Sequence, residues 1–128
     1  LANVNINKLI DFHLSHKKIA TLTGIELKSR FGVLSVAENN RAISFLEKPK
    51  YNNSLVNGGY FVFSNKIFKY LKNDSTVLEK KPLETLSKEK NLYVFKHEGF
   101  WHSMDTLRDK NLLEGIWKSK NIPWKIWK

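Results

Sequence analysis

The side chains best suited to chemistry lie in residues 45–63. This stretch reads FLEKPKYNNSLVNGGYFVF, and it begins and ends as apolar sequence typical of strands. Between those ends lie a carboxylate beside an ammonium group, Glu47 and Lys48, and an Asn-Gly-Gly tripeptide at 57–59. Glycine inside a strand usually marks a turn, a bulge or a close approach of the backbone to a ligand. We therefore interpret the stretch as two strand ends flanking a polar small-molecule site.

Glu47 and Lys48 allow two interpretations. A carboxylate accepts hydrogen bonds from vicinal sugar hydroxyls, and a lysine ammonium offers a compact positive charge to a phosphate. Adjacent strand residues point to opposite faces, however, so the two can also be an exposed pair beside a turn. Residue chemistry alone favours the exposed pair.

Four further positions are candidates for the same site. Gly32 could place a backbone N–H against a ligand, although most such glycines form turns. Asn57 and Gly58 are compatible both with a ligand-facing loop and with a β-bulge. Asp105 stands where an expected strand gives way to a helix, the usual ligand side of an α/β sheet. Its carboxylate could hold Mg²⁺ with a phosphate, or it could be a helix N-cap, which context alone favours.

Other catalytic signatures are weak. His13 and His16 share a helix face, but neither they nor the other two histidines indicate a third metal ligand. The sequence contains no Walker-type or dinucleotide-binding phosphate loop, and no Ser-His-Asp arrangement can be inferred from it.

The composition predicts one globular domain. The 128 residues are 41% hydrophobic and 12% aromatic, which suffices for a core. No apolar run approaches the roughly 20 residues of a membrane-spanning helix. The absence of cysteine excludes disulfides and thiolate metal sites, and it fits a cytoplasmic protein. The chain begins with Leu1, which fits a piece of a longer protein.

The basic balance does not by itself indicate nucleic acid. The net charge is +10, but only three of the 22 basic residues are arginine, and the lysines are scattered along the chain. Nucleic-acid surfaces usually cluster their charge and favour arginine. We expect neither a nucleic-acid nor a membrane partner.

Periodicity and capping residues predict alternating helices and strands. The interleaving predicts an α/β fold with a mixed sheet and flanking helices. The aromatic end of the chain, IPWKIWK, is expected to contact another subunit or domain. Strands are expected at 19–27, 33–37, 41–46, 56–63, 92–96 and 101–104. Helices are expected at 6–17 with Asn5 as N-cap, from Ser64 or Asn65 to Leu71, at 82–89, and from Asp105 or Thr106 to about Ser119.

The motifs RFG, FLEKP, VNGGYFVF, HEGFWHSMDTLRD and PWKIW, in this order, support a further step. The chain resembles the C-terminal half of the bacterial glucose-1-phosphate cytidylyltransferases, a branch of the sugar nucleotidyltransferase superfamily. The resemblance covers nearly all of 1–128 and implies the C-terminal part of a Rossmann-like, GT-A-type fold. It implies transfer of a cytidylyl group from CTP to α-D-glucose 1-phosphate, giving CDP-glucose and pyrophosphate for O-antigen and other surface polysaccharides. It also implies Mg²⁺ as cofactor and a homo-oligomer.

The resemblance assigns roles to the candidate residues. Lys48 corresponds to the lysine that holds the sugar phosphate, and Glu47 to the carboxylate that binds glucose hydroxyls. Asn57 and Gly58 correspond to the asparagine and glycine of the sugar pocket. Gly32 corresponds to the glycine whose backbone faces the sugar.

The resemblance also implies that half of an active site is missing. Asp105 corresponds to one of two aspartates that bind Mg²⁺, and with Lys48 it is the expected catalytic residue. The YGDG turn with the other aspartate and the GGxGTRL nucleotide-binding loop are not in this sequence. Leu27-Lys28-Ser29 replaces the family's Pro-Pro-Gly. We expect the chain to bind CTP only with the missing N-terminal part, and to be inactive alone. The alternative is a non-catalytic sugar-phosphate-binding or assembly module.

Overall fold

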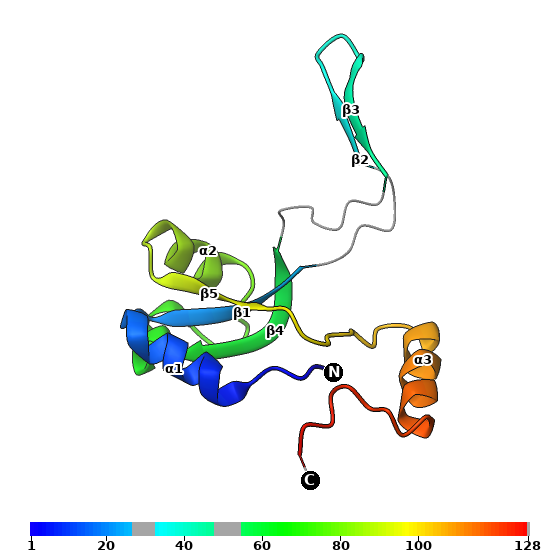
Figure 1. Ribbon diagram of the computed structural model, residues 1–128. Coiled ribbons are helices and arrows are strands. Elements are labelled where there is room, and N and C mark those ends of the chain that lie inside the picture. Colours follow the sequence, from blue (N-terminus) through cyan, green and yellow to red (C-terminus); the bar gives the residue numbers. More distant parts are fainter. Residues whose placement is uncertain (27–32, 48–54, 128) are drawn as a thin grey trace.

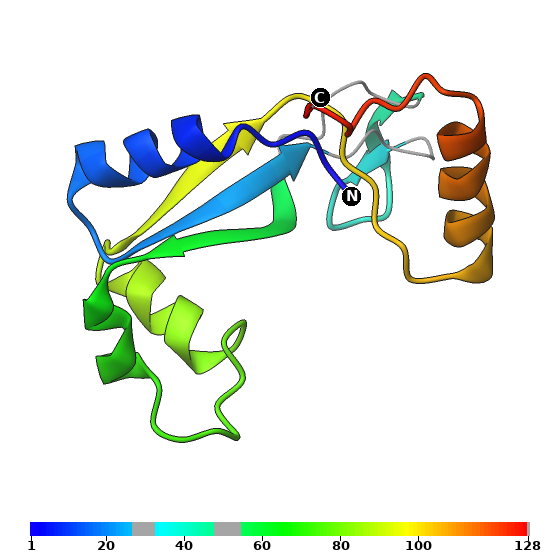
Figure 2. The ribbon, with the colours of Figure 1, turned by 90° about the horizontal axis from the view of Figure 1, so that it is seen from below.

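The computed structural model describes residues 1–26, 33–47 and 55–127. Its body is a three-stranded mixed sheet in the order β4–β1–β5, with helices on both faces (Figures 1 and 2). Strand β1 (Ala20–Glu26) is antiparallel to β4 (Leu55–Phe63) and parallel to β5 (Leu92–His97). The expected α/β fold with a mixed sheet and flanking helices is confirmed.

Helix α1 (Ile6–His16) covers one face of the sheet. It begins at the expected cap, where the Asn5 side chain accepts a 3.0 Å hydrogen bond from a first-turn amide. It ends where Lys17 takes a left-handed conformation. Leu9 and His13, one turn apart, are its buried residues. Three other apolar side chains of this helix are exposed: Ile6, Ile10 and Leu14.

The opposite face is covered by a short 3₁₀ helix, η1 (Asn65–Tyr70), and by α2 (Lys81–Lys88). Pro82 lies in the first turn of α2, where no intrahelical N–H bond is lost. The side chains between these helices and the sheet form the main hydrophobic cluster, which is Ala20, Ile67, Leu83 and Leu86. The neighbouring Phe68 does not join this cluster, because its side chain is 71% exposed.

Strands β2 (Val33–Val36) and β3 (Ala42–Leu46) form a separate antiparallel hairpin. Figure 1 shows it standing away from the three-stranded sheet. Leu34 lies opposite Phe45, and both side chains are more than half exposed, like those of Val36 and Ile43. The hairpin therefore presents apolar surface that the described chain leaves uncovered.

The expected strand at 101–104 is wrong. Only Trp101 forms a bridge, to Ala2 in the N-terminal segment, and the next four residues have no regular structure. This segment leads to α3 (Leu107–Lys118), in which Leu113 is buried. The other apolar side chains of α3 are half-buried or exposed. In the described ranges, no helix has the length and apolar character needed to cross a membrane.

The aromatic end of the chain is partly packed against the chain itself. Trp124 is only 5% exposed, and its ring centroid lies 5.3 Å from that of Phe100. Trp124 is therefore buried by this chain itself, without the expected contact to another subunit or domain. Ile126 and Trp127, in contrast, are more than half exposed.

A chain of polar contacts joins α1 to β1. The amide of Lys18 donates to His16 Nδ1 at 3.0 Å, so the neutral His16 ring carries its proton on Nε2. His16 Nε2 lies 2.7 Å from Thr21 Oγ1 and therefore donates to it. The Thr21 hydroxyl, buried completely, can then donate to His13 Nδ1 at 2.9 Å. With both histidines neutral, each contact in this relay has one donor and one acceptor, and protonation of His16 would set its Nδ1–H against the Lys18 amide.

We predict that Thr21→Val destabilises the chain by about 1–3 kcal/mol, because it leaves two histidine nitrogens without their partner. Thr23→Val is the matched control. Thr23 lies on the same strand, is as completely buried, and has a hydroxyl with no hydrogen-bond partner. Its replacement by a methyl group should leave stability unchanged or raise it. Urea unfolding of both variants measures the difference, and equal losses would contradict the relay.

We also predict that stability falls in mild acid. Burial lowers the pKa of His13, and burial followed by the nearby His13 lowers that of His16, both from 6.5. As pH falls, the two histidines therefore take up protons in the unfolded state before they do so in the folded state. The stability that the neutral histidines contribute is complete above about pH 6.5, and it is lost as pH falls through their folded-state pKa values. Unfolding free energy measured from pH 7.5 to 5 should decline, and less so in Thr21→Val.

Candidate active site

The Asn-Gly-Gly tripeptide forms a β-bulge in β4. Leu22 pairs with Phe61 and Gly24 pairs with Asn57, so three residues of β4 oppose Thr23 alone. The Asn57 side chain supports the bulge, because its Oδ1 accepts a 2.8 Å hydrogen bond from the next-but-one amide, that of a glycine with φ of 80°. Of the two interpretations of this tripeptide, the structure shows the bulge, a feature often found beside binding sites.

Gly58 is fixed between β1 and Trp101. Its α-carbon is buried, and an added Cβ would lie 2.7 Å from Ile25 Cγ1 and 3.0 Å from the Thr23 carbonyl oxygen. On its other side, the Trp101 indole N–H donates a 2.9 Å hydrogen bond to the Gly58 carbonyl. The bulge is thus tied to the segment that leads into α3.

The start of α3 is held by a capping box around Asp109. The N-cap is Thr106, not Asp105, and its hydroxyl both accepts from the Asp109 amide and donates to the Asp109 carboxylate. The same carboxylate accepts from the Thr106 amide and contacts His102 Nε2 at 3.2 Å. The Thr106 hydroxyl, above all, lowers the pKa of Asp109. Asp109 is therefore a structural anchor rather than the surface partner of Arg108 that its position suggests.

Asp105 lies just before this cap and is exposed. Within the described part of the chain, its carboxylate makes no hydrogen bond or ion pair. Among the described residues there is no group of three side chains that could hold a metal ion. Mg²⁺ often takes one or two carboxylates and completes its shell with phosphate oxygens and waters. Asp105 fits one corner of such a site and does not form the site by itself.

The other expected site residues are placed only in part. Glu47 follows β3 and is exposed, in the hairpin that stands apart from the sheet carrying Asn57 and Gly58. Lys48 and Gly32 lie outside the described residues. The structure therefore brings together the bulge and the segment leading to Asp105, with Trp101 as the link between them.

Three residues that organise this region were not expected from the sequence: Trp101, His102 and Asp109. The Thr106-x-x-Asp109 spacing is a recognisable variant of the capping box. An indole N–H also needs an acceptor when it is partly buried. The sequence therefore indicates that Trp101 has a hydrogen-bond partner, but it does not indicate which residue that partner is. No local signal predicts that this acceptor lies on β4.

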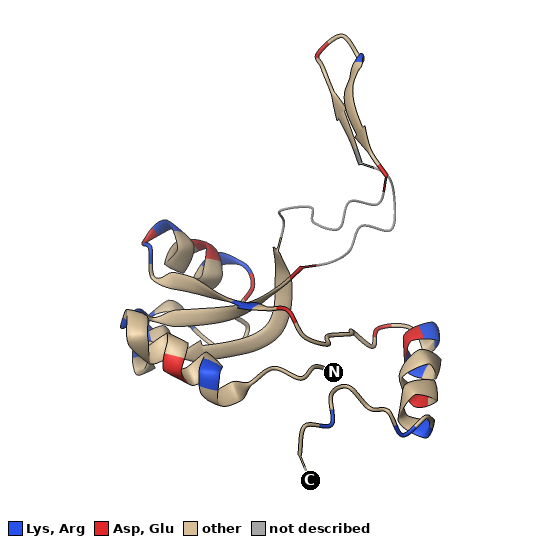
Figure 3. Ribbon diagram, viewed as in Figure 1, with Lys and Arg blue, Asp and Glu red and all other residues tan. Residues whose placement is uncertain are grey.

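Charge is dispersed over the surface around these elements. Figure 3 shows lysine and arginine interspersed with aspartate and glutamate along α1, α2 and α3. In α3, Lys110 and Glu114 form an exposed i,i+4 ion pair at 3.5 Å.

Comparisons with known proteins place the chain among nucleotide-transferring enzymes. The family model for nucleotidyl transferases matches residues 1–114. The chain is 44% identical over 127 residues to the glucose-1-phosphate cytidylyltransferase of Salmonella typhi, covering 99% of this chain and 49% of that protein. It is 33% identical over 113 residues to a mannose-1-phosphate guanyltransferase of Saccharomyces cerevisiae, covering 84% of this chain and 31% of that protein.

A solved structure shares the fold. The chain superposes with a TM-score of 0.60 and 18% identity on a Bacillus anthracis protein assigned as a glucose-1-phosphate thymidylyltransferase, crystallised with sucrose. The match covers 100% of this chain and 52% of that one. The chain also spans about half the length of the cytidylyltransferase relatives it matches.

The packing around Gly58 generates a stability prediction. Gly58→Ala should destabilise the chain by about 1–3 kcal/mol, because the new methyl group meets β1 backbone as well as Ile25. Gly115→Ala is the control, since a Cβ at this helical glycine in α3 meets open space. It should stabilise by about 0.5–1 kcal/mol. Urea unfolding measures both changes in stability. A Gly58→Ala variant as stable as the original chain would show that the bulge can widen without a loss of unfolding free energy, and would contradict the prediction.

Proposed function

The chain belongs to the nucleotidyl transferase family, as its motifs indicate, and we propose that it supplies the sugar 1-phosphate side of a glucose-1-phosphate cytidylyltransferase. The observation that carries this proposal is the high identity, along nearly the whole chain, to proteins of that name. Identity to mannose-1-phosphate guanyltransferases is lower and covers less of the chain. The proposed domain comprises 1–128 and lacks the nucleotide-binding part.

The proposed reaction is an in-line transfer. A phosphate oxygen of α-D-glucose 1-phosphate attacks the α-phosphorus of CTP, and the bond to the β-phosphate oxygen breaks. The products are CDP-glucose, a nucleotide sugar for O-antigen synthesis, and pyrophosphate. Lys48 balances the charge on the sugar phosphate, while Glu47 accepts hydrogen bonds from glucose hydroxyls. Gly32 brings its backbone close to the sugar.

The geometry of the bulge supports the assignment of Asn57. Its Oδ1 is already occupied within the bulge, which orients the amide and leaves the side-chain NH₂ as a donor for a sugar hydroxyl. Gly58 keeps the bulge small enough to pack on β1, and its carbonyl is taken by Trp101. The pair thus offers a fixed donor rather than an adaptable loop.

Asp105 is the proposed metal ligand of this chain. Mg²⁺, when bound, would neutralise charge on the phosphates during transfer. Asp105 is exposed beside a segment held by the capping box and by Trp101. Its carboxylate can therefore bind a Mg²⁺ ion shared with the phosphates with little rearrangement of the backbone. A second carboxylate must come from outside this chain.

The whole protein is proposed to be a cytoplasmic homo-oligomer that acts on small molecules, with neither nucleic acid nor membrane as partner. The exposed apolar side chains of the β2–β3 hairpin favour association. The second candidate is a non-catalytic sugar-phosphate-binding or assembly module.

The experiment that tests the function is pyrophosphate release from CTP and glucose 1-phosphate with Mg²⁺. In a protein that also carries the nucleotide-binding half, Lys48→Ala should raise the KM for glucose 1-phosphate at least tenfold and change the KM for CTP less than twofold. Lys110→Ala, which removes one charge on α3, is the control and should leave both unchanged. Equal losses for the two substrates would contradict the role of Lys48.

The same assay separates the two candidate functions. Chain 1–128 alone should release no pyrophosphate but should bind glucose 1-phosphate. Turnover by the chain alone would disprove the half-site proposal, and an inactive full-length protein would support the non-catalytic module.

A further inference from the structure

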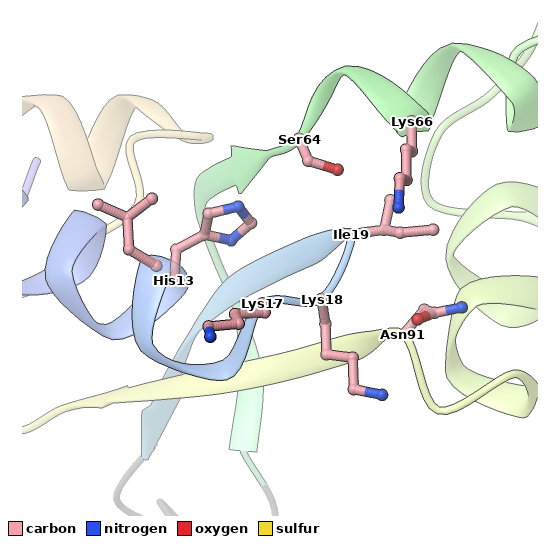
Figure 4. A pocket seen from close by; sticks show the side chains of 8 residues that line it. His13, Lys17, Lys18, Ile19, Ser64, Lys66 and Asn91 are labelled. Atoms are coloured by element: carbon pink, nitrogen blue, oxygen red, sulfur yellow. The ribbon is translucent and has the colours of Figure 1, made fainter.

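A pocket lies where α1 ends and β1 begins, away from the bulge. Its volume is about 450 Å³, within the range of roughly 300–1,000 Å³ typical of small-molecule sites. Figure 4 shows that its walls come from three places: the end of α1, the turn after β4, and the residue before β5. The lining residues are His13, Leu14, Lys17, Lys18, Ile19, Ser64, Lys66 and Asn91.

The charge of this lining has one sign. Lys17, Lys18 and Lys66 line the pocket, and no aspartate or glutamate does. Within the described part of the chain, no ion pair joins any of the three to a carboxylate. Three like charges around one cavity repel one another, and an anion bound among them would remove that repulsion.

Ser64 supplies a buried hydroxyl without a partner. Its Oγ is inaccessible to solvent and makes no hydrogen bond in the structure. The residue precedes η1, but its side chain does not cap that helix. In Figure 4 the hydroxyl lies on the same side of the pocket as the Lys66 ammonium. A buried hydroxyl left unpaired is unfavourable, and a ligand acceptor in the cavity would satisfy it once a change of the Ser64 rotamer brings the hydroxyl to the cavity surface.

His13 adds a neutral donor. When the Thr21 hydroxyl donates to its Nδ1, as the relay between α1 and β1 allows, the proton of the neutral ring resides on Nε2. No described residue accepts from this Nε2, and the ring lines the pocket. The relay is therefore compatible with the tautomer that can donate to a ligand in the cavity.

Nearby acidic groups are engaged elsewhere. Glu89, close to Asn91 in sequence, accepts a hydrogen bond from the Tyr70 hydroxyl, and this contact raises the pKa of Tyr70. Glu89 does not line the cavity. The pocket therefore combines ammonium groups with hydroxyl and imidazole donors, a set that matches phosphate oxygens.

We propose that this pocket is a second ligand site, distinct from the sugar 1-phosphate side, and that it binds a small anion with two or more phosphate groups. The volume exceeds the need of one phosphate, and three ammonium groups suit a polyvalent anion. The site uses none of the residues assigned to the transfer reaction, so it stands or fails independently of the proposed function.

Titration of isotope-labelled chain 1–128 with inorganic pyrophosphate, followed by NMR, tests the proposal. The Lys48→Ala background removes binding at the sugar-phosphate side, and salt near about 0.15 M screens long-range attraction to the basic chain. Shifts should be largest at the amides of Lys17, Lys18, Lys66 and Asn91. Titration with glucose 1-phosphate, which has a single phosphate, should give at least fivefold weaker binding at the same amides.

Matched variants separate a built site from general attraction. Lys18→Gln with Lys66→Gln should weaken pyrophosphate binding at least tenfold, and Ser64→Ala, which changes no charge, at least twofold. Lys110→Gln with Lys118→Gln removes two charges from α3, at the other end of the molecule (Figure 1), and should change binding less than twofold. Equal losses in the two lysine pairs, or shifts spread over the whole chain, would overturn the proposal.

Discussion

Strand β1 is hydrogen-bonded along both of its edges, and the rest of the molecule depends on this double pairing. A strand buried on both faces and paired on both sides must satisfy every backbone group within the fold. One face of β1 receives α1 through the Thr21 relay, and the other lies on the cluster around Leu86. The proposed polyanion pocket and the bulge of the candidate active site lie at opposite ends of this strand, the pocket at its start and the bulge toward its end.

The bulge shows how packing and chemistry constrain one another. Extra residues in β4 must bow away from β1, and only a residue without a side chain can remain in contact at position 58. The indole N–H of Trp101 then donates to the carbonyl of Gly58, and this hydrogen bond holds the segment that leads into α3 beside the bulge. A site assembled in this way is positioned by the register of two strands, which is stiffer than a loop held only at its ends.

Most elements could be predicted from periodicity, capping residues and turn signals, since β1 to β5 and α1 to α3 all begin and end within a few residues of expectation. The failures have physical causes. A strand at 101–104 needs a partner strand, and only Ala2 pairs there. Trp124 packs against Phe100, and no local sequence pattern predicts this contact between distant segments. For 57–59, the sequence could not distinguish a bulge from a loop, because the bulge is defined by the pairing register of β4 with β1, which the local sequence does not encode. The roles of Glu47 and Lys48 came from resemblance alone.

The central position of β1 has a consequence for the order of folding. Its antiparallel partner β4 follows sooner in the chain than its parallel partner β5, whose Leu92 pairs with Ala20. During synthesis, one edge of β1 therefore stays open until β5 and its flanking segments have emerged, and closing the longer loop carries the larger entropic cost. Of the two pairings of β1, the one with β5 therefore has the larger sequence separation and the larger loop-closure cost.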